Sequence, residues 1–308
     1  MALTVRAVRD DDDIWRIRDF LRQVFLLNGR QEVSWHVARY DYWRWQGVEN
    51  TEHFRLAEVV FIWETADVQI AAVLNPEGRG EAFLQVHPGL RTPRLEEEMV
   101  GVAEEHLAAP GPNGRPGLRV WASDHDDLRR GILTRRGYTP GDGPEHLRRR
   151  PLSLAVPDAP AVAGYSVRAL GDVEELPARS WVSWKAFHPD EPDERYQGWE
   201  WYHNIQRGPL YRRDLDIVAV APGGEFASFC TAWYDDVTRS AYFEPVGTAP
   251  AHQRRGLGKA VVCAALHRLK RLGATVAFVG GYSPAANALY ASLGFAQYDL
   301  LEPCVKEL

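Results

Sequence analysis

The sequence predicts an α/β protein of two tandem domains, each with a mixed central β-sheet and helices on both faces. Its 308 residues exceed one domain of ordinary size and suit two. In each half a run of apolar, strand-like segments precedes a helix, the order expected of a mixed sheet with a helical crossover. Similar sites also recur in the same order, at offsets between 156 and 162 residues: Val5 and Val167, Arg39 and Arg195, Pro88 and Pro250, and Gly137 and Gly294.

The boundary between the halves is marked by composition. Residues 156–164 read VPDAPAVAG, a proline-rich and small-residue segment typical of a linker. We therefore predict a first domain over residues 1–156, a linker over 157–164 and a second domain over 165–308. The repeated layout indicates an ancient duplication of one fold.

The expected elements follow the same plan in both halves. After a short strand and an aromatic-rich helical stretch, the first half has apolar strands, a helix, a strand and a short helix; its strands are expected at 5–8, 59–64, 70–75 and 118–123. In the second half, strands are expected at 166–170, 216–221, 226–234, 241–248 and 275–280, with helices over 256–273 and 283–295.

The bulk composition excludes several classes of protein. The formal net charge is −6, so no global basic field favours nucleic acid. The three cysteines form no CxxC pair and the ten histidines no HxxxH or HxH pair, so we expect no metal site and a reducing compartment. We find no signal-like apolar region at the start and no run of about eighteen apolar residues. These observations predict a cytoplasmic protein without a membrane partner.

The segment HQRRGLGKA, residues 252–260, joins the strand expected at 241–248 to the following helix. The first N–H groups of a helix have no internal acceptor, and the helix dipole adds positive charge there. Gly256 and Gly258 would let a diphosphate approach the backbone, while Arg254, Arg255 and Lys259 add positive charge. Alone, the segment is equally compatible with a basic strand-to-helix turn.

A second motif lies about thirty residues later, in SPAANALYASLGF, residues 283–295. Asn287 and Tyr290 are three residues apart and share a face of the short helix expected there. Without further information, Tyr290 is also compatible with a half-buried packing role.

Together the two motifs resemble those of the GNAT superfamily of acetyl-CoA-dependent N-acetyltransferases. The Q/R-x-x-G-x-G/A loop of that family corresponds to residues 253–258, and its N-x-x-(L)-Y-x-x-x-G-F segment to residues 287–295. The resemblance covers roughly residues 165–305, and the tandem layout is similar to that of the mycothiol synthases. It implies acetyl-CoA as co-substrate, held by Val246, Gly247, Thr248, Gln253, Arg254, Arg255, Gly256, Leu257, Gly258, Lys259 and Asn287.

The resemblance also implies direct attack of an amine on the thioester. Tyr290 would protonate the departing thiolate, which helps most where charge develops late in the reaction. Glu244 is the candidate base, since it precedes Thr248 by an even count on one strand and should share its face. Alternatively, Glu244 binds the ammonium of the substrate or pairs with an arginine.

Aromatic residues cluster early in the second half, in the region that borders the acceptor pocket of the GNAT fold. Trp181, Trp184 and His188 have no counterpart in the first half and are the candidate substrate-binding residues. Trp199 and Trp201 repeat a pattern of the first half, which favours packing for them.

The first half lacks these chemical features. With Pro88 aligned on Pro250, Arg94 falls at Gly256 and Glu96 at Gly258, and both changes oppose diphosphate binding. Leu133 stands where the second half has Tyr290. We therefore predict a degenerate first domain that does not bind acetyl-CoA.

The sequence thus predicts an N-acetyltransferase whose second domain acetylates a primary amine of a small molecule. One alternative is a non-catalytic acyl-CoA-binding regulatory or scaffolding protein, although binding alone does not require Tyr290. A second alternative is transfer of a longer acyl group. Acceptors compatible with the sequence include small amines, aminoglycoside-like compounds, amino-sugar thiols and peptide N-termini, and homo-oligomerisation through sheet edges stays open.

Overall fold

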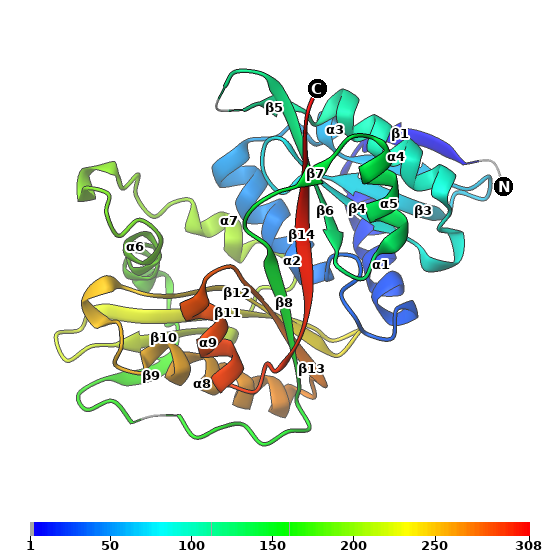
Figure 1. The fold of residues 1–308 in the computed structure, drawn as a ribbon. Helices are drawn as coiled ribbons and strands as arrows, with labels where there is room; N and C mark the ends of the chain where they lie inside the picture. Colours follow the sequence, from blue (N-terminus) through cyan, green and yellow to red (C-terminus); the bar gives the residue numbers. More distant parts are fainter. Residues whose placement is uncertain (1–2, 112, 160) are drawn as a thin grey trace. The chain divides into compact units, whose positions relative to one another are not determined.

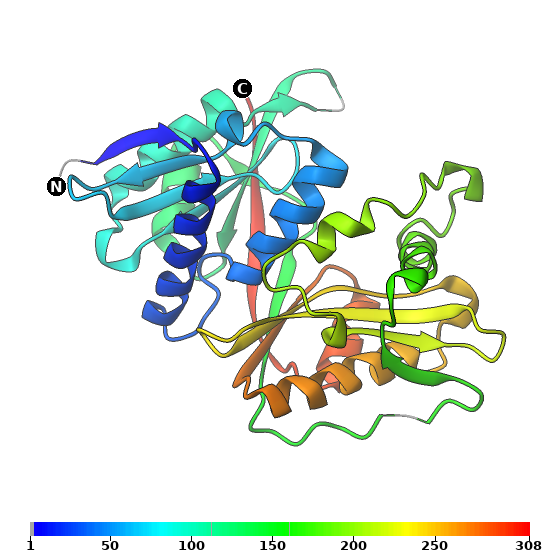
Figure 2. The ribbon, with the colours of Figure 1, turned by 180° about the vertical axis from the view of Figure 1, so that it is seen from behind.

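The computed structural model describes residues 3–111, 113–159 and 161–308, which form two compact units (Figures 1 and 2). Of the described residues, unit 1 comprises 3–43, 47–111, 113–147 and 299–308, and unit 2 comprises 44–46, 148–159 and 161–298. The chain passes from unit 1 to unit 2 within strand β8 (Glu145–Pro151) and returns to unit 1 within β14 (Gln297–Glu307).

Unit 1 combines short strands with helices of mixed length. Its further strands are β1 (Thr4–Ala7), β2 (Phe61–Glu64), β3 (Ile70–Asn75), β4 (Glu81–Val86), β5 (Ala109–Pro110), β6 (Pro116–Ser123) and β7 (Thr139–Pro140). Its helical segments are α1 (Asp11–Leu27), α2 (Val37–Tyr42), η1 (Trp43–Glu52), α3 (Leu56–Val59), η2 (Pro88–Leu90), α4 (Pro93–His106) and α5 (Asp127–Arg135).

Unit 2 follows the same plan with longer strands. Its strands are β9 (Ser166–Ala169), β10 (Asp216–Val220), β11 (Phe226–Asp235), β12 (Ser240–Thr248) and β13 (Val276–Gly281). Its helical segments are η3 (Val173–Glu175), α6 (Leu176–Phe187), η4 (Asp193–Arg195), α7 (Tyr202–Gln206), η5 (Arg213–Leu215), η6 (Pro250–His252), α8 (Leu257–Leu272) and α9 (Pro284–Ser292).

The two units share one sheet topology, which confirms the predicted mixed α/β fold. In unit 1, β1, β2, β3 and β4 pair antiparallel in order, and β4 then pairs parallel with β6. In unit 2, β9, β10, β11 and β12 pair antiparallel in order, and β12 pairs parallel with β13. Beyond this repeat, unit 1 gains β14 from the end of the chain, antiparallel to β6.

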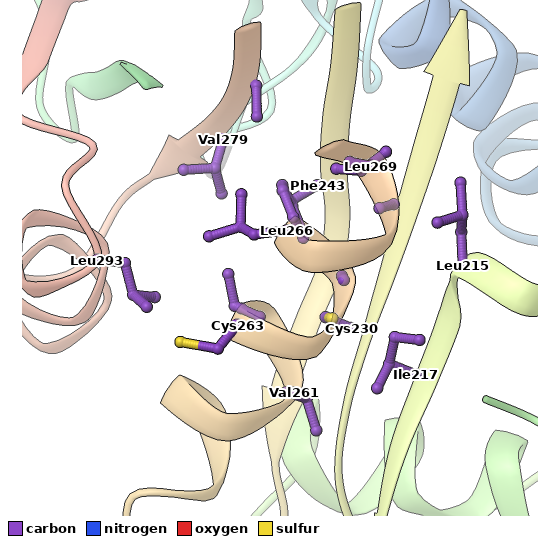
Figure 3. Packing of buried hydrophobic residues seen from close by; sticks show 14 of the residues in the cluster. Leu215, Ile217, Cys230, Phe243, Val261, Cys263, Leu266, Leu269, Val279 and Leu293 are labelled. Carbon is purple, nitrogen blue, oxygen red and sulfur yellow. The ribbon is translucent and has the colours of Figure 1, made fainter. Parts of the chain in front are cut away.

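The core of unit 2 lies between its sheet and α8 (Figure 3). Leu257, Val261, Ala265 and Leu269 recur every four residues and bury one stripe of this helix. They pack against the face of the sheet that carries Cys230. The helix ends at Gly273, whose φ of +88° is unfavourable for residues with a Cβ, so the predicted stop is confirmed. Helix α6 packs against β11 and β12.

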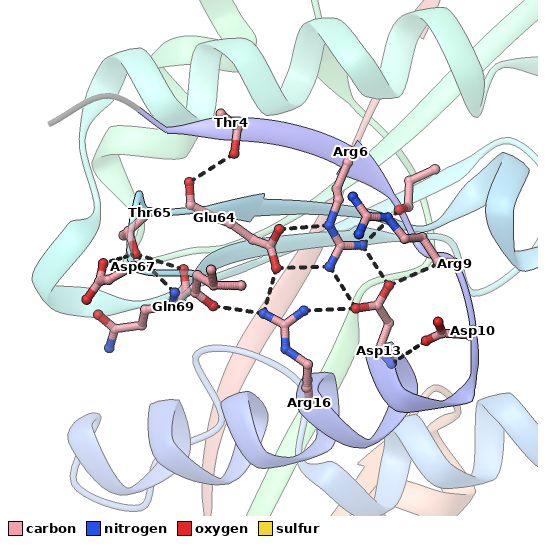
Figure 4. A network of polar contacts seen from close by, with 12 residues as sticks. Thr4, Arg6, Arg9, Asp10, Asp13, Arg16, Glu64, Thr65, Asp67 and Gln69 are labelled. Carbon is pink, nitrogen blue, oxygen red and sulfur yellow. Dashed lines mark hydrogen bonds and ion pairs between the residues drawn. The ribbon is translucent and has the colours of Figure 1, made fainter.

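Unit 1 has α4 and α5 on one face of its sheet and α1 and α2 on the other (Figures 1 and 2). A partly buried ionic network connects β1 and β2 to the first turn of α1 (Figure 4). Arg6 donates from Nη2 to Asp13 Oδ1 at 2.7 Å and from Nε to Glu64 Oε2 at 2.7 Å. Asp10 caps α1 by accepting from the backbone N–H of Asp13 at 3.1 Å.

The compact units differ from the expected domain limits in three places, the first being residues 44–46, which lie in unit 2. Residues 148–156 lie in unit 2 rather than in the first domain, and residues 299–308 lie in unit 1 rather than in the second. Residues 148–151 are the end of β8 and residues 299–307 are most of β14; both join the sheet of the other half by long-range pairing, which local composition does not encode. Pro160 of the expected linker lies outside the described residues.

One of the repeated sequence motifs does not correspond to a repeated structure. Residues 39–45, RYDYWRW, and residues 195–201, RYQGWEW, share the pattern R-Y-x-x-W-x-W. In unit 1, Arg39 lies within α2, and its Nη1 donates to buried Glu145 at 2.9 Å. The matching Arg195 of unit 2 ends η4 and is exposed, with Glu191 3.3 Å away. This similarity is confined to the sequence.

Candidate active site

The loop between β12 and α8 turns sharply so that the start of α8 faces the end of β12. Arg254 and Gly256 have φ values of +59° and +86°, and Gln253 Nε2 donates to the carbonyl of Thr248 at 3.2 Å. The N–H of Ala260 donates to the carbonyl of Gly256 at 3.0 Å. The N–H groups of residues 257–259 precede this bond and are therefore available to a ligand.

A cavity of about 550 Å³ opens at this loop. Nine of the residues predicted to hold acetyl-CoA line it: Val246, Gly247, Thr248, Gln253, Arg254, Gly256, Leu257, Gly258 and Lys259. A Cβ on Gly258 would lie 3.3 Å from Leu289 Cδ2 and 3.5 Å from Thr248 Oγ1. Glycine therefore keeps the narrow space between the helix start and the strand end open, which suits an extended ligand with an anionic group.

Tyr290 lines the same cavity from α9, with 6% of the residue exposed. Its ring packs edge-on against Phe295, and no hydrogen bond engages its hydroxyl within the described part of the chain. Burial raises the pKa of the phenol, and the nearby Cys230 and Glu244 raise it further. The side chain therefore retains its proton at neutral pH, as a proton donor must.

Glu244 lies at a β-bulge. Val246 pairs with Cys230 and Phe243 with Ala232, so Glu244 and Pro245 together oppose Thr231. The extra residue interrupts the alternation of side chains along β12. The even count between Glu244 and Thr248 therefore does not place the two side chains on one face of the sheet, contrary to the prediction from the sequence. Glu244 is not among the lining residues of the cavity, but its charge acts on Tyr290.

Asn287 and Arg255 also lie outside the lining of the cavity. Asn287 Nδ2 donates to the carbonyl of Gly281 at 3.2 Å, and its Oδ1 accepts from Arg148 Nε at 2.6 Å. Asn287 thus fastens α9 to β13 and β8. Arg150 adds a bond from Nε to the carbonyl of Leu293 at 2.8 Å. No sequence motif had indicated either arginine.

The three predicted substrate-binding residues lie on α6 and directly after it, in an aromatic cluster separate from the cavity. Trp184 stacks on His188 with ring centroids 3.9 Å apart, and Trp181 meets Tyr196 edge-on at 5.0 Å. Neither tryptophan lines the cavity, nor does His188, whose Nδ1 lies 2.9 Å from Glu191 Oε1. Helix α6 instead turns Ala186 and Phe187 toward the cavity.

The remaining lining residues were missed by the sequence analysis: His252, Ala285, Ala286 and Leu289. Ala286 precedes Tyr290 by four residues, so the helical repeat around Tyr290 offered a signal for Ala286 but none for Leu289, which directly precedes Tyr290. His252 Nδ1 lies 2.9 Å from the hydroxyl of Tyr165, a pairing across 87 residues that no local pattern reveals.

The equivalent region of unit 1 is built differently. Only Arg91 and Thr92 separate η2 from α4, whereas residues 253–256 separate η6 from α8. When the first residues of α4 and α8 are superimposed, Thr92 corresponds to Gly256 and Arg94 to Gly258. The alignment based on Pro88, which matched Arg94 with Gly256 and Glu96 with Gly258, is therefore shifted by two residues. The loop that would surround a diphosphate is shorter by the same two residues.

The first turn of α4 contains a buried carboxylate of the chain itself. Glu96 is fully buried, accepts from Arg91 Nε in a short contact, and accepts from Arg129 Nε at 3.1 Å. Although burial alone would raise the pKa of Glu96, the charges and hydrogen bonds of Arg129 and Arg91 outweigh it and hold the pKa low.

Helices α5 and α9 end alike, at Gly137 and Gly294 with φ near +86° and +85°. The following N–H donates to the carbonyl of Leu133 in unit 1, at 3.0 Å, and of Tyr290 in unit 2, at 3.1 Å. This shared geometry supports the alignment of Leu133 with Tyr290.

Two other features are absent from the described residues, a group of metal ligands and a helix able to span a membrane. Within residues 3–111, 113–159 and 161–308, no group of three or more His, Cys, Asp or Glu side chains is arranged to hold a metal ion. In the same described ranges, no helix has the length and apolar character needed to cross a membrane.

Known proteins resemble the chain in sequence and in fold. Residues 173–295 match the model of the acetyltransferase (GNAT) family. The mycothiol acetyltransferase of Paenarthrobacter aurescens (strain TC1) is 28% identical over 249 residues, covering 74% of this chain and 70% of that protein. That of Rhodococcus opacus (strain B4) is 28% identical over 255 residues, covering 74% and 75%.

Two solved structures share the fold over nearly the whole chain. A GCN5-related N-acetyltransferase from Sphaerobacter thermophilus superposes with a TM-score of 0.67 at 16% identity, covering 99% of this chain and 95% of that one. A tandem GNAT protein from the clavulanic acid biosynthesis pathway gives a TM-score of 0.65 at 14% identity, covering 99% and 98%. Residues 173–295 thus belong to the GNAT acetyltransferase family, and the chain is an acetyltransferase with a tandem GNAT-like fold.

Proposed function

We propose that unit 2 binds acetyl-CoA in the 550 Å³ cavity and transfers its acetyl group to a primary amine of a small molecule. The observation that carries this proposal is that one cavity is lined both by the open start of α8 and by the buried phenol of Tyr290. The first feature suits an anionic group, and the second suits a leaving group that needs a proton.

The residues of the cavity divide this work. The N–H groups of residues 257–259 and the side chain of Lys259 hold the diphosphate, and Gly258 leaves room for it. The residues at the end of β12, from Val246 to Thr248, orient the pantetheine arm. Acetyl-CoA supplies the acetyl group as a thioester, which the neutral amine attacks directly.

Tyr290 then holds the proton that the departing sulfur requires. Its raised pKa is consistent with this role, because a phenol that stayed ionised could not donate. Glu244 is retained as the candidate group that accepts the proton of the amine. Support for it now comes from its charge acting on Tyr290 rather than from strand alternation.

We assign no acetyl-CoA to unit 1. Support comes from the loop shortened by two residues, from Glu96 at the start of α4 and from Leu133 in place of Tyr290. A diphosphate there would have to displace a buried carboxylate held by two arginines, which is costly.

The acceptor to test first is a mycothiol-related amine, the deacetylated form of mycothiol. Its support is the name of the relatives, mycothiol acetyltransferase, at 28% identity across about three quarters of the chain.

The proposal is tested by comparing Tyr290→Phe with the native protein in an acetyl-transfer assay read by mass detection of the acetylated amine. We expect kcat to fall about 100-fold with an unchanged KM for acetyl-CoA, since proton donation typically contributes at least that factor. Tyr282→Phe is the matched control, because Tyr282 is 59% exposed and precedes α9. Acetyl-CoA binding without turnover in the native protein, with all candidate amines, would instead favour a regulatory acyl-CoA-binding role.

A further inference from the structure

Three consecutive arginines lie near the end of β8, at residues 148–150. Arg148 and Arg150 are buried, with 8% and 1% of the residue exposed, whereas Arg149 Nε donates to Oε1 of the exposed Gln297 at 3.1 Å. Alternate residues of a strand point to opposite faces, so Arg148 and Arg150 share the face that Arg149 does not. Buried arginines are costly unless their N–H groups are matched, so the partners of these two are informative.

Arg148 binds the chain on both sides of Tyr290. Its Nε donates to Asn287 Oδ1 at 2.6 Å, and its Nη1 donates to the backbone carbonyl of Phe295 at 3.1 Å. These partners precede Tyr290 by three residues and follow it by five. Because a guanidinium is planar and presents its donors in a rigid fork, one side chain fixes the distance between the two points.

Arg150 binds the end of the same helix. Its Nε donates to the carbonyl of Leu293, the residue that ends α9, at 2.8 Å, where the last helical carbonyls lack partners and carry partial negative charge. Its two other donors bind the carbonyls of Pro151 at 3.2 Å and Ala155 at 2.6 Å. A Cβ on Gly294 would lie 3.1 Å from Arg150 Nε, so glycine also leaves room for the guanidinium.

The place of the Tyr290 phenol depends on this helix. Within the residues that the structure describes, no hydrogen bond engages the hydroxyl, so the phenol is placed by the backbone of α9 and by the packing of its ring on Phe295. Phe295 is itself held, since Arg148 binds its carbonyl. A displacement of about 1 Å at a reacting group can cost about 100-fold in rate, so a proton donor placed in this way requires a fixed helix.

We propose that Arg148 and Arg150 are positioning residues, which hold α9 so that the phenol of Tyr290 faces the cavity of unit 2. Neither arginine lines that cavity, so both act through α9 rather than on the ligands. This inference rests on the role proposed for Tyr290 and adds the end of β8 to the residues on which turnover depends. Loss of Arg148 should therefore reduce turnover without weakening acetyl-CoA binding.

The kinetic test compares Arg148→Met with Arg149→Met, using acetyl-CoA and the deacetylated form of mycothiol. Methionine keeps an unbranched apolar side chain and removes every donor. Arg149→Met makes the same change at the next residue, whose Nε binds Gln297 rather than α9. We expect kcat to fall about tenfold in Arg148→Met with an unchanged KM for acetyl-CoA, and both constants to stay native in Arg149→Met.

A double variant separates positioning from general support of the fold. If Arg148 acts through the phenol, Arg148→Met should lower kcat in the native protein but not in the Tyr290→Phe background. A side chain that only stabilises unit 2 would lower kcat by the same factor in both. Arg148→Lys, which keeps the charge and a single donor group, takes the place of Arg148→Met if that variant does not fold.

The position of the phenol can also be measured without turnover. Burial raises the pKa of Tyr290, so release of α9 should lower it, whereas loss of the arginine charge alone could only raise it. The titration is followed by NMR with ¹³Cζ-labelled tyrosine, and Tyr290→Phe assigns the resonance among the 12 tyrosines. We expect Tyr290 to titrate about one pH unit lower in Arg148→Met than in the native protein and in Arg149→Met.

Three results would overturn the proposal: equal kcat in Arg148→Met and Arg149→Met, a further loss of kcat when Arg148→Met is added to Tyr290→Phe, or the same titration of Tyr290 in both arginine variants. Native kcat in Tyr290→Phe, or no turnover in the native protein, would contradict the proposed function instead. The titration alone would then decide whether the two arginines position the phenol.

Discussion

Gly258→Glu is the sharpest perturbation of the proposed acetyl-CoA site, because we expect it to change binding far more than folding. Gly258 is the second residue of α8, where a carboxylate interacts favourably with the helix dipole. The new Cβ would lie 3.3 Å from Leu289 Cδ2, the end of a flexible side chain, and 3.5 Å from Thr248 Oγ1. We therefore expect the melting temperature to stay within a few degrees of the native value, corresponding to a change of less than about 1 kcal/mol.

The cost to binding follows from charge. A carboxylate about 4 Å from one diphosphate charge is repelled by ~4 kcal/mol at an effective dielectric constant of ~20. Allowing for screening and side-chain movement, we expect a loss of at least ~2.7 kcal/mol, which corresponds to 100-fold in the Kd for acetyl-CoA. Calorimetric titration measures this change, with one equivalent expected per chain of the native protein.

The chain supplies a matched control at the same helical position. Arg94 is the second residue of α4 and is exposed, so Arg94→Glu introduces the same side chain at the equivalent site of unit 1. We expect this variant to bind one equivalent with native affinity. Native-like binding by Gly258→Glu would refute the placement of the diphosphate. Two equivalents in the native protein, with one lost in Arg94→Glu, would refute the assignment of an empty unit 1.

Two further predictions concern stability. Asp216→Ala removes the carboxylate that lies 2.8 Å from Nε of the buried Arg179, so the free energy of unfolding measured in urea should fall by about 3–5 kcal/mol. The control Asp214→Ala disrupts an exposed ion pair and should cost at most ~1 kcal/mol. Similar losses in both variants would contradict this account. The hydrogen bond from Arg6 lowers the pKa of Asp13 from 3.8 to about 2, against the opposing effect of burial. Ionised Asp13 therefore stabilises the folded state above pH 3.8, and this contribution is lost as the pH falls through about 2. Asp13→Asn should therefore lower the urea midpoint at pH 6 and differ little from the native protein near pH 2; a difference that is constant with pH would count against the ionic network.

Much of the fold could be predicted because local patterns and fold agree. Apolar residues at a spacing of four define α8, and the segment 70–75 forms β3 with the expected limits. The exchange of β14 into unit 1 could not be predicted, since the pairing of Cys304 with Val120 spans 184 residues and leaves no local signal.

The site was predictable where a residue type is required by backbone geometry. Gly256, at a φ of +86°, and Gly258, in the narrow space beside Thr248, are such positions. The face of Glu244 was not predictable, because counting alternate residues along β12 presumes a regular ladder and one extra residue at the bulge invalidates the count. The same limit applies to Trp184, whose aromatic character is compatible equally with a pocket and with the stacking on His188 that the structure contains.

The two units illustrate how one electrostatic requirement can be met in two ways. The start of each helix after the fourth strand presents N–H groups and partial positive charge that favour an anion. In unit 2 the loop of residues 253–256 is long enough to leave this place accessible, and Tyr290 stands beside it. In unit 1 the loop has only two residues, and the first turn of α4 contains Glu96, which is buried and bound by Arg91 and Arg129. Because an internal carboxylate costs no loss of translational freedom, it is hard for a dissolved diphosphate to displace.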